Sequence, residues 1–170
     1  MGLEITVSPL VKSDIPAILE IENDSQPEPW SETAFLEEIG KAHSRVLVVR
    51  QAPAASVGPD SLRGVIAGYI CFWSVVGEIQ VLNIAVRRDL RRKGIGRRLI
   101  DAAIRAGRED GARWVTLEVR QSNLEARKLY ESIGFRIVGE RPNYYGEMEE
   151  SAILMTLDIV ECQGCQTDDG

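Results

Sequence analysis

The sequence contains few cysteines, a single histidine and no long hydrophobic run. Three cysteines in 170 residues are too few for a disulfide scaffold, so we predict a protein of a reducing compartment, the cytoplasm. No apolar stretch approaches the roughly 18–20 residues that cross a bilayer, so we expect no contact with a membrane. The first residues lack a basic region followed by an apolar stretch, and we expect no signal peptide.

Metal and nucleic-acid binding are not expected either. Cys162 and Cys165 have the spacing of metal ligands, but no second pair accompanies them, and His43 is far away in the sequence. We interpret the two cysteines as loose thiols and predict no metal site. The formal net charge of −6 argues against general nucleic-acid binding and favours the approach of basic ligands or proteins.

Hydrophobic periodicity predicts an α/β (α+β) domain over residues 1–159, followed by a polar, disordered tail over residues 160–170. The first strand is predicted over Leu3–Ser8, and Gly77 separates two strands of a hairpin. Residues 79–119 alternate as strand, helix and strand, which predicts a parallel pair. We therefore expect a mixed, mostly antiparallel sheet with one central parallel pair and about four flanking helices.

Local signals predict where the helices begin, end and face. Ser13 and Ser31 are predicted to cap the first two helices, and Ser122 forms a capping box with Glu125. Gly134 is the predicted end of the last helix. One helix carries an apolar stripe that we expect in the core, made of Ile95, Leu99, Ile100, Ala103 and Ile104.

An unusual basic run, "RRDLRRKGIGRRLI", occupies residues 87–100. Seven of the 20 basic residues of this acidic protein lie in it, with Asp89 as the only acid. A helix beginning near Gly94 and Gly96 would expose unpaired amides and a partial positive charge, which attract phosphate. The run lacks the sequence of a Walker A loop or a dinucleotide fingerprint. It predicts a site for a pyrophosphate-bearing cofactor; the alternative is a solvated basic helix start.

The wider segment "VLNIAVRRDLRRKGIGRRLI" resembles the core of the GNAT superfamily of N-acetyltransferases, with Arg91-x-x-Gly94-x-Gly96 as the signature. The stretches "EPWSETAF", "LEVRQSNLEARKLYESIGF" and "NYY" are similar to RimI-type ribosomal-protein-alanine N-acetyltransferases, and the resemblance covers residues 4–159. It implies the GNAT fold and acetyl-CoA as co-substrate. The cofactor-binding residues that it implies are Ile84, Ala85, Val86, Arg91, Arg92, Lys93, Gly94, Ile95, Gly96, Arg97 and Asn123.

Two residues are candidates for acid–base chemistry. In "WVTLEVR", Val115, Leu117 and Val119 share one face, which leaves Glu118 on the other. The resemblance implies that Glu118 is the general base, acting through water; alternatively it pairs with Arg120 or another arginine. Tyr130 lies on the apolar stripe of its helix and reads as a core tyrosine, whereas the resemblance makes it the general acid.

Four residues carry open alternatives at the edges of this site. Trp30 either lines the acceptor entrance or staples its own helix, and Tyr144 and Tyr145 either stack over the acceptor or anchor a loop. The resemblance implies that Asn123 contacts coenzyme A, and the alternative is a second capping residue.

The sequence is thus interpreted as an acetyl-CoA-dependent N-acetyltransferase. The resemblance implies direct transfer, in a ternary complex, to the N-terminal alanine of a small-subunit ribosomal protein. Two alternatives stay open: acetylation of a small-molecule amine or a lysine, and a coenzyme A-sensing module without turnover. The expected partners are acetyl-CoA and a protein N-terminus, with no direct nucleic acid and no membrane.

Overall fold

The computed structural model describes residues 4–52, 64–145 and 150–160. It divides into two compact units. The first unit comprises Met1–Trp73 and Leu82–Ala103, and the second comprises Ser74–Val81 and Ile104–Gly170. Cys162 and Cys165, and the predicted tail beyond residue 160, lie outside the described residues.

The strands follow the hydrogen-bonded order β1-β2-β3-β4-β5-β7-β6. Strands β1–β2, β2–β3, β5–β7 and β6–β7 pair antiparallel, whereas β4 and β5 run parallel from Glu78 and Trp114 to Val81 and Leu117. This confirms the predicted mixed, mostly antiparallel sheet with one parallel pair. The strands are β1 (Ile5–Pro9), β2 (Ser44–Gln51), β3 (Val65–Val75), β4 (Glu78–Val86), β5 (Trp114–Arg120), β6 (Arg136–Tyr145) and β7 (Glu150–Asp158).

Four α-helices occur in the described residues: α1 (Ile15–Ser25), α2 (Glu32–Gly40), α3 (Ile95–Glu109) and α4 (Leu124–Ile133). Short 3-10 turns, η1 (Lys12–Asp14) and η3 (Arg88–Leu90), precede α1 and α3. The predicted apolar stripe of α3 is buried, with Leu99 and Ile100 fully inaccessible. None of the described helices is long and apolar enough to cross a membrane.

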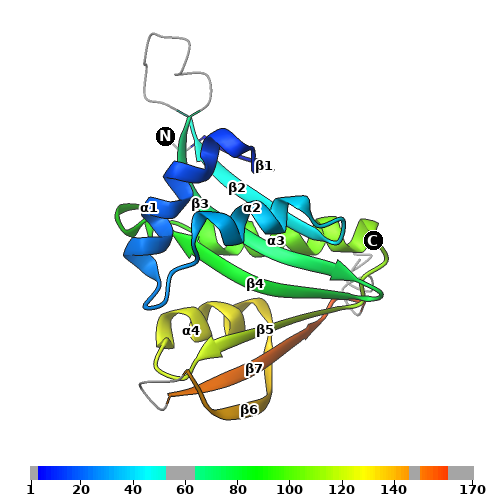
Figure 1. Ribbon diagram of the computed structural model, residues 1–170. Coiled ribbons are helices and arrows are strands. Elements are labelled where there is room, and N and C mark those ends of the chain that lie inside the picture. The colour runs from blue at the N-terminus through cyan, green and yellow to red at the C-terminus, as the bar shows by residue number, and fades with distance from the viewer. Residues whose placement is uncertain (1–3, 53–63, 146–149, 161–170) are drawn as a thin grey trace, which may run out of the picture. The chain divides into compact units, whose positions relative to one another are not determined.

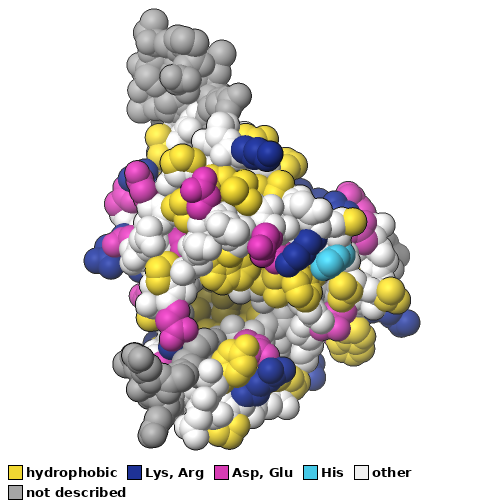
Figure 2. Space-filling view, viewed as in Figure 1, with side chains coloured by type: hydrophobic (Ala, Val, Ile, Leu, Met, Phe, Trp, Pro, Cys, Tyr) yellow, Lys and Arg dark blue, Asp and Glu magenta, His cyan; other side chains and the backbone are white. Residues whose placement is uncertain are grey.

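In the first unit, α1 and α2 lie over β2 and β3 (Figure 1). Their apolar faces meet the strands in one cluster that includes Ile18, Phe35, Val48 and Tyr69, all fully buried. The outer surface of this unit carries side chains of both charges among apolar ones (Figure 2). Burial of the helix faces against the strands is the main stabilising contribution, because short helices are marginal alone.

In the second unit, α4 joins β5 to the antiparallel pair of β6 and β7. The alternation predicted for β5 is confirmed, because Val115, Leu117 and Val119 are buried while Glu118 is half-buried. The chain leaves α4 at Gly134, whose φ of 115° is the left-handed conformation predicted for this C-cap.

Two local predictions were wrong. The first strand begins at Ile5 and ends at Pro9 rather than at Ser8. Ser13 lies inside η1 and does not cap α1; the N-cap is Asp14. The carboxylate of Asp14 accepts instead from the Val11 amide at 3.0 Å and pairs with Arg50 at 2.5 Å.

Candidate active site

The turn between β4 and α3 has the backbone of an anion-binding loop. Arg92 and Gly94 both adopt the left-handed region, with φ of 63° and 78°. The Gly94 carbonyl accepts the first helical hydrogen bond, from the Arg98 amide at 3.1 Å. The amides of the first turn of α3 therefore come directly after Gly94 in the chain. Such left-handed residues before a helix N-terminus are typical of concave backbone sites that bind anions.

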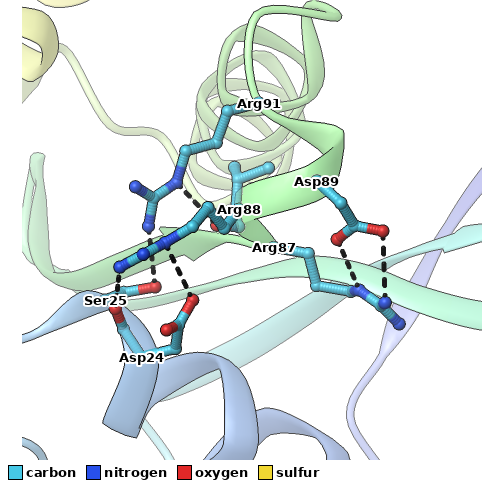
Figure 3. A network of polar contacts seen from close by, with 7 residues as sticks. Asp24, Ser25, Arg87, Arg88, Asp89 and Arg91 are labelled. Carbon is cyan, nitrogen blue, oxygen red and sulfur yellow. Dashed lines mark hydrogen bonds and ion pairs between the residues drawn. The ribbon is translucent and has the colours of Figure 1, made fainter.

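The side chains of the basic run fall into two groups. Arg87 pairs with Asp89 at 3.1 Å, and Arg88 pairs with Asp24 at 3.4 Å (Figure 3). Arg91 donates to the Val86 carbonyl and to Ser25 Oγ, both at 3.1 Å, and so ties the turn to β4 and to the end of α1. A second set is exposed around the turn and could approach a phosphate: Arg92, Lys93, Arg97 and Arg98.

The backbone of β4 just before this turn is held closely against β3. A Cβ atom on Gly68 would lie 2.7 Å from the Ala85 carbonyl oxygen, so only glycine permits this approach. Ala85 is buried, while Ile84 and Val86 are half-buried. These three residues, predicted to act through backbone groups, therefore lie on a fixed strand in the same unit as the turn.

Glu118 stands on β5 in the second unit and meets an arginine. Its carboxylate lies 3.1 Å from Arg141 of β6, and 29% of its side chain is exposed. The partner is not Arg120, which pairs with Glu150 at 3.6 Å. An ion pair this accessible to solvent contributes about 0–1 kcal/mol, so it does not by itself account for a carboxylate at this position.

Tyr130 stands on α4 of the same unit and is 5% exposed. Its ring packs against Phe135 with centroids 5.6 Å apart. This burial agrees with a core tyrosine, and it leaves the role of the hydroxyl as a prediction.

The predicted cap of α4 was wrong. The N-cap is Asn123, whose side-chain oxygen accepts from the Ala126 amide at 3.2 Å, and the helix begins at Leu124. The backbone amide of Ser122 donates to Glu150 on β7 at 2.7 Å. That contact ties the residue before the cap to β7. The side-chain oxygen of Asn123 is engaged in this cap. The contact of Asn123 with coenzyme A stays a prediction.

The candidate acceptor residues differ in what surrounds them. Trp30 packs on Phe35 with centroids 5.4 Å apart, the N′ to N4 contact of a hydrophobic staple, and its ring is half-buried. Tyr144 and Tyr145 were expected in a loop but belong to the end of β6, where Asn143 with φ of 54° opens a bulge. Tyr144 is exposed, and the Arg141 guanidinium lies 5.6 Å from its ring centroid.

Sequence reasoning missed a buried carboxylate in the first unit. Glu22 is fully inaccessible and accepts from the Trp30 amide at 2.8 Å, from Asn83 Nδ2 at 2.9 Å and from the Tyr69 hydroxyl. Burial, with the Glu22 charge beside it, raises the pKa of Tyr69 far above its ordinary value. The only signal in the sequence was an acid on the apolar stripe of α1.

The described residues contain no group of three His, Cys, Asp or Glu side chains able to hold a metal ion. Burial raises the pKa of the Cys71 thiol to about 12, which makes it unreactive at neutral pH. The described part of the chain thus offers backbone amides, arginines, a carboxylate and a phenol for chemistry. Such a set suits group transfer from a phosphate-bearing donor.

The fold and this turn define an acyltransferase of the N-acetyltransferase class, and the sequence comparison agrees. Residues 15–135 match the Acetyltransferase (GNAT) family. The [ribosomal protein bS18]-alanine N-acetyltransferase of Escherichia coli K12 is 34% identical over 156 residues, which cover 91% of this chain and 97% of that protein. The chain therefore belongs to the GNAT acetyltransferase family.

Solved structures agree with this assignment. The crystal structure of the ribosomal-protein-S18-alanine N-acetyltransferase from Escherichia coli superposes with a TM-score of 0.76 at 33% identity, covering 92% of this chain and 94% of that one. Arabidopsis thaliana NAA60 in complex with acetyl-CoA gives a TM-score of 0.79 at 18% identity, covering 92% and 99% of the two chains, which shows the shared fold.

The cap of α4 yields a stability prediction. Replacing Asn123 by Ala removes the acceptor for the Ala126 amide and should lower the free energy of unfolding by about 1 kcal/mol. The matched change Ser122→Ala leaves the Ser122 backbone bond to Glu150 intact and should cost less than about 0.5 kcal/mol. Urea denaturation of both variants measures the difference, and a larger loss for Ser122→Ala than for Asn123→Ala would return the cap to Ser122.

Proposed function

We propose that this chain transfers an acetyl group from acetyl-CoA to the α-amine of the N-terminal alanine of a small-subunit ribosomal protein. The observation that carries the proposal is the exposed turn at residues 91–94 with two left-handed residues before α3. Relatives named as ribosomal protein bS18-alanine N-acetyltransferases, about one third identical over most of the chain, support the choice of acceptor.

The cofactor would be held by its phosphates at this turn. The amides of Ile95, Gly96 and Arg97, with Arg92 and Lys93 around them, fit the charge and size of a pyrophosphate. Gly94 is exposed, and apart from Gly94 and its two chain neighbours no atom of the described residues would lie within 4 Å of a Cβ placed on it, so the turn has room for a ligand. Backbone groups of Ile84, Ala85 and Val86 would receive the acyl arm. When bound, acetyl-CoA supplies an activated acetyl thioester.

The acceptor amine must lose a proton before it can attack. An α-amine with a pKa near 7.7–8.0 is roughly 15% neutral at pH 7, whereas a lysine amine near 10.4 is below ~0.1% neutral. Glu118 takes the proton, directly or through water, and this modest base suffices for an N-terminus. Tyr130 donates a proton to the departing thiolate, because a phenol is protonated at neutral pH. The transfer is direct and passes through no covalent enzyme intermediate.

The N-terminal residue of the acceptor would enter beside aromatic side chains. Trp30 is half-buried and Tyr144 is exposed, so neither side chain is closed off from solvent. Such a ring would stack on a small first residue such as alanine, and the resemblance implies the same role for Tyr145. We propose the cytoplasm as the location of this reaction, with the ribosomal protein as partner and no direct role for nucleic acid.

The acceptor assignment is tested with peptides. We expect a peptide with a free N-terminal alanine, copied from a small-subunit ribosomal protein, to gain one acetyl group at its α-amine. Tandem mass spectrometry locates the acetyl group, and a matched peptide with a blocked N-terminus and an internal lysine is the control. Acetylation of the blocked peptide at the same rate would transfer the activity to lysine side chains. Binding of acetyl-CoA without release of thiol to any acceptor would indicate a sensor.

The cofactor site is tested with two matched glycines. Gly94 and Gly111 have φ of 78° and 82°, and at both positions a Cβ would have no atom of the described residues within 4 Å beyond the glycine and its two chain neighbours. Alanine at either position should therefore meet the same backbone strain, about 1–2 kcal/mol. Only Gly94→Ala should weaken acetyl-CoA binding, by about tenfold in calorimetry, because its strain distorts the phosphate turn. Equal affinities for the two variants would exclude this turn as the cofactor site.

The proposed role of Glu118 as the base is tested by changing Glu118 and its ion-pair partner Arg141 in separate variants. We expect Glu118→Gln to lower kcat about 100-fold with acetyl-CoA affinity unchanged, since the amide cannot accept the proton. Arg141→Gln breaks the same ion pair but keeps the carboxylate, so its kcat should stay within about tenfold of the wild type. Steady-state kinetics measure both. A Glu118→Gln enzyme with wild-type turnover would leave Glu118 with a structural role only.

A further inference from the structure

The buried carboxylate of Glu22 sits at the centre of the first unit. We define the Glu22 cluster as Glu22, Trp30, Tyr69 and Asn83, which all belong to that unit. Oε1 accepts two hydrogen bonds, from the Trp30 amide at 2.8 Å and from Asn83 Nδ2 at 2.9 Å, and Oε2 accepts from the Tyr69 hydroxyl.

A carboxylate this deeply buried is costly unless every oxygen is hydrogen-bonded. No hydrogen-bonded cation accompanies Glu22 among the described residues, so neutral donors carry the whole compensation. The raised pKa of Tyr69, caused first by burial, keeps its phenol protonated, and it remains a donor. The positions of the three donor groups are therefore set by the one carboxylate that they all bind.

Two of these donors come from segments to which the proposed reaction gives a role. The Trp30 amide belongs to the segment between α1 and α2, residues 26–31, whose Trp30 ring is a candidate acceptor contact. Asn83 belongs to β4 and directly precedes the three residues proposed to receive the acyl arm, 84–86. The carboxylate thus joins an acceptor segment to a cofactor strand.

Gln26 makes a second link between the same two segments. Its Nε2 donates to Asn83 Oδ1 at 3.1 Å and to the Ile84 carbonyl at 3.4 Å. Asn83 therefore accepts from Gln26 on one side and donates to Glu22 on the other. Because Glu22 binds the Trp30 main chain, and Gln26 the Ile84 main chain, the Glu22 cluster and Gln26 together hold backbone groups of both segments through directional hydrogen bonds.

We propose that Glu22 is a positioning residue that, together with Gln26, fixes segment 26–31, and with it the Trp30 ring, against β4: Glu22 does so at Asn83, and Gln26 at Asn83 and Ile84. The inference rests on the proposed function, because it gives Trp30 a role toward the acceptor. Glu22 touches neither substrate and acts through Trp30 and Asn83. It should control acceptor binding without controlling the binding of acetyl-CoA.

The test compares two buried glutamates of the same unit. Glu38 is 6% exposed and also accepts from three donors, Lys41 at 2.5 Å, Ser44 at 2.6 Å and Trp73 at 2.8 Å. None of these donors belongs to segment 26–31 or to β4. Glu22→Met and Glu38→Met both replace a hydrogen-bonded carboxylate by an apolar chain of similar length, and both should lower the melting temperature.

Only Glu22→Met should raise the KM for an alanine-initiated peptide, by about fivefold or more, the value of one lost hydrogen bond. Its affinity for acetyl-CoA should stay within about twofold of the wild type. Glu22→Gln keeps one oxygen for the Trp30 and Asn83 donors and should return the KM to within about twofold. Hydrogen exchange of the Trp30 amide should be faster in Glu22→Met than in Glu38→Met.

Equal KM values for the Glu22→Met and Glu38→Met enzymes would overturn the inference. So would a Glu22→Met enzyme that loses peptide and acetyl-CoA affinity by the same factor, which indicates general loosening. If Glu22→Met does not fold, Gln26→Ala is used for the test instead. A KM of that variant for the alanine-initiated peptide equal to the wild-type KM would overturn the inference. Failure of the proposed function is distinct, because the wild-type enzyme would then acetylate no alanine-initiated peptide.

Discussion

The constraint on which the first unit depends is the need to compensate one buried negative charge. The donors to Glu22 lie 8, 47 and 61 residues further along the chain, at Trp30, Tyr69 and Asn83. The carboxylate is satisfied only when α1, β3, β4 and the segment before α2 are all in place. The hydrophobic effect supplies most of the stability of such a core, but it is non-directional. The carboxylate adds direction, so it selects one arrangement of these four segments.

The basic run of this acidic protein also depends on how its charges are compensated. Arg87 and Arg88 pair with acids, and Arg91 binds a carbonyl and a serine, so these three arginines brace the β4–α3 turn within the first unit. Arg92, Lys93 and Arg97 are exposed at the turn itself. One part of the run is therefore engaged within the first unit, and another part is exposed where we propose that a phosphate binds.

Local patterns were reliable wherever neighbouring residues alone decide the conformation. The stripe of α3, the alternation of β5, the Ser31 cap and the Gly134 C-cap were all predicted, because each depends on contacts within about four residues or on one buried face. The caps at Ser13 and Ser122 were wrong. Asp14 and Arg50 fix the turn before α1, and Glu150 on β7 holds the amide of Ser122. Arg50 and Glu150 are distant in sequence from these turns, whereas Asp14 also binds the nearby Val11 amide, so the turn before α1 combines a local and a distant contact.

By itself, the sequence determined the periodicity of the helices and strands, the glycine-containing basic turn and the resemblance that led to the GNAT family. These features are encoded by residues close together in the chain. Only the tertiary structure decided that Arg141 is the partner of Glu118, that Gly68 admits the Ala85 carbonyl, and that Glu22 is buried among three donors. The first two depend on which strand residues lie side by side, and the third on the packing of α1 against β3, β4 and the segment before α2, all of which bring together residues far apart in sequence.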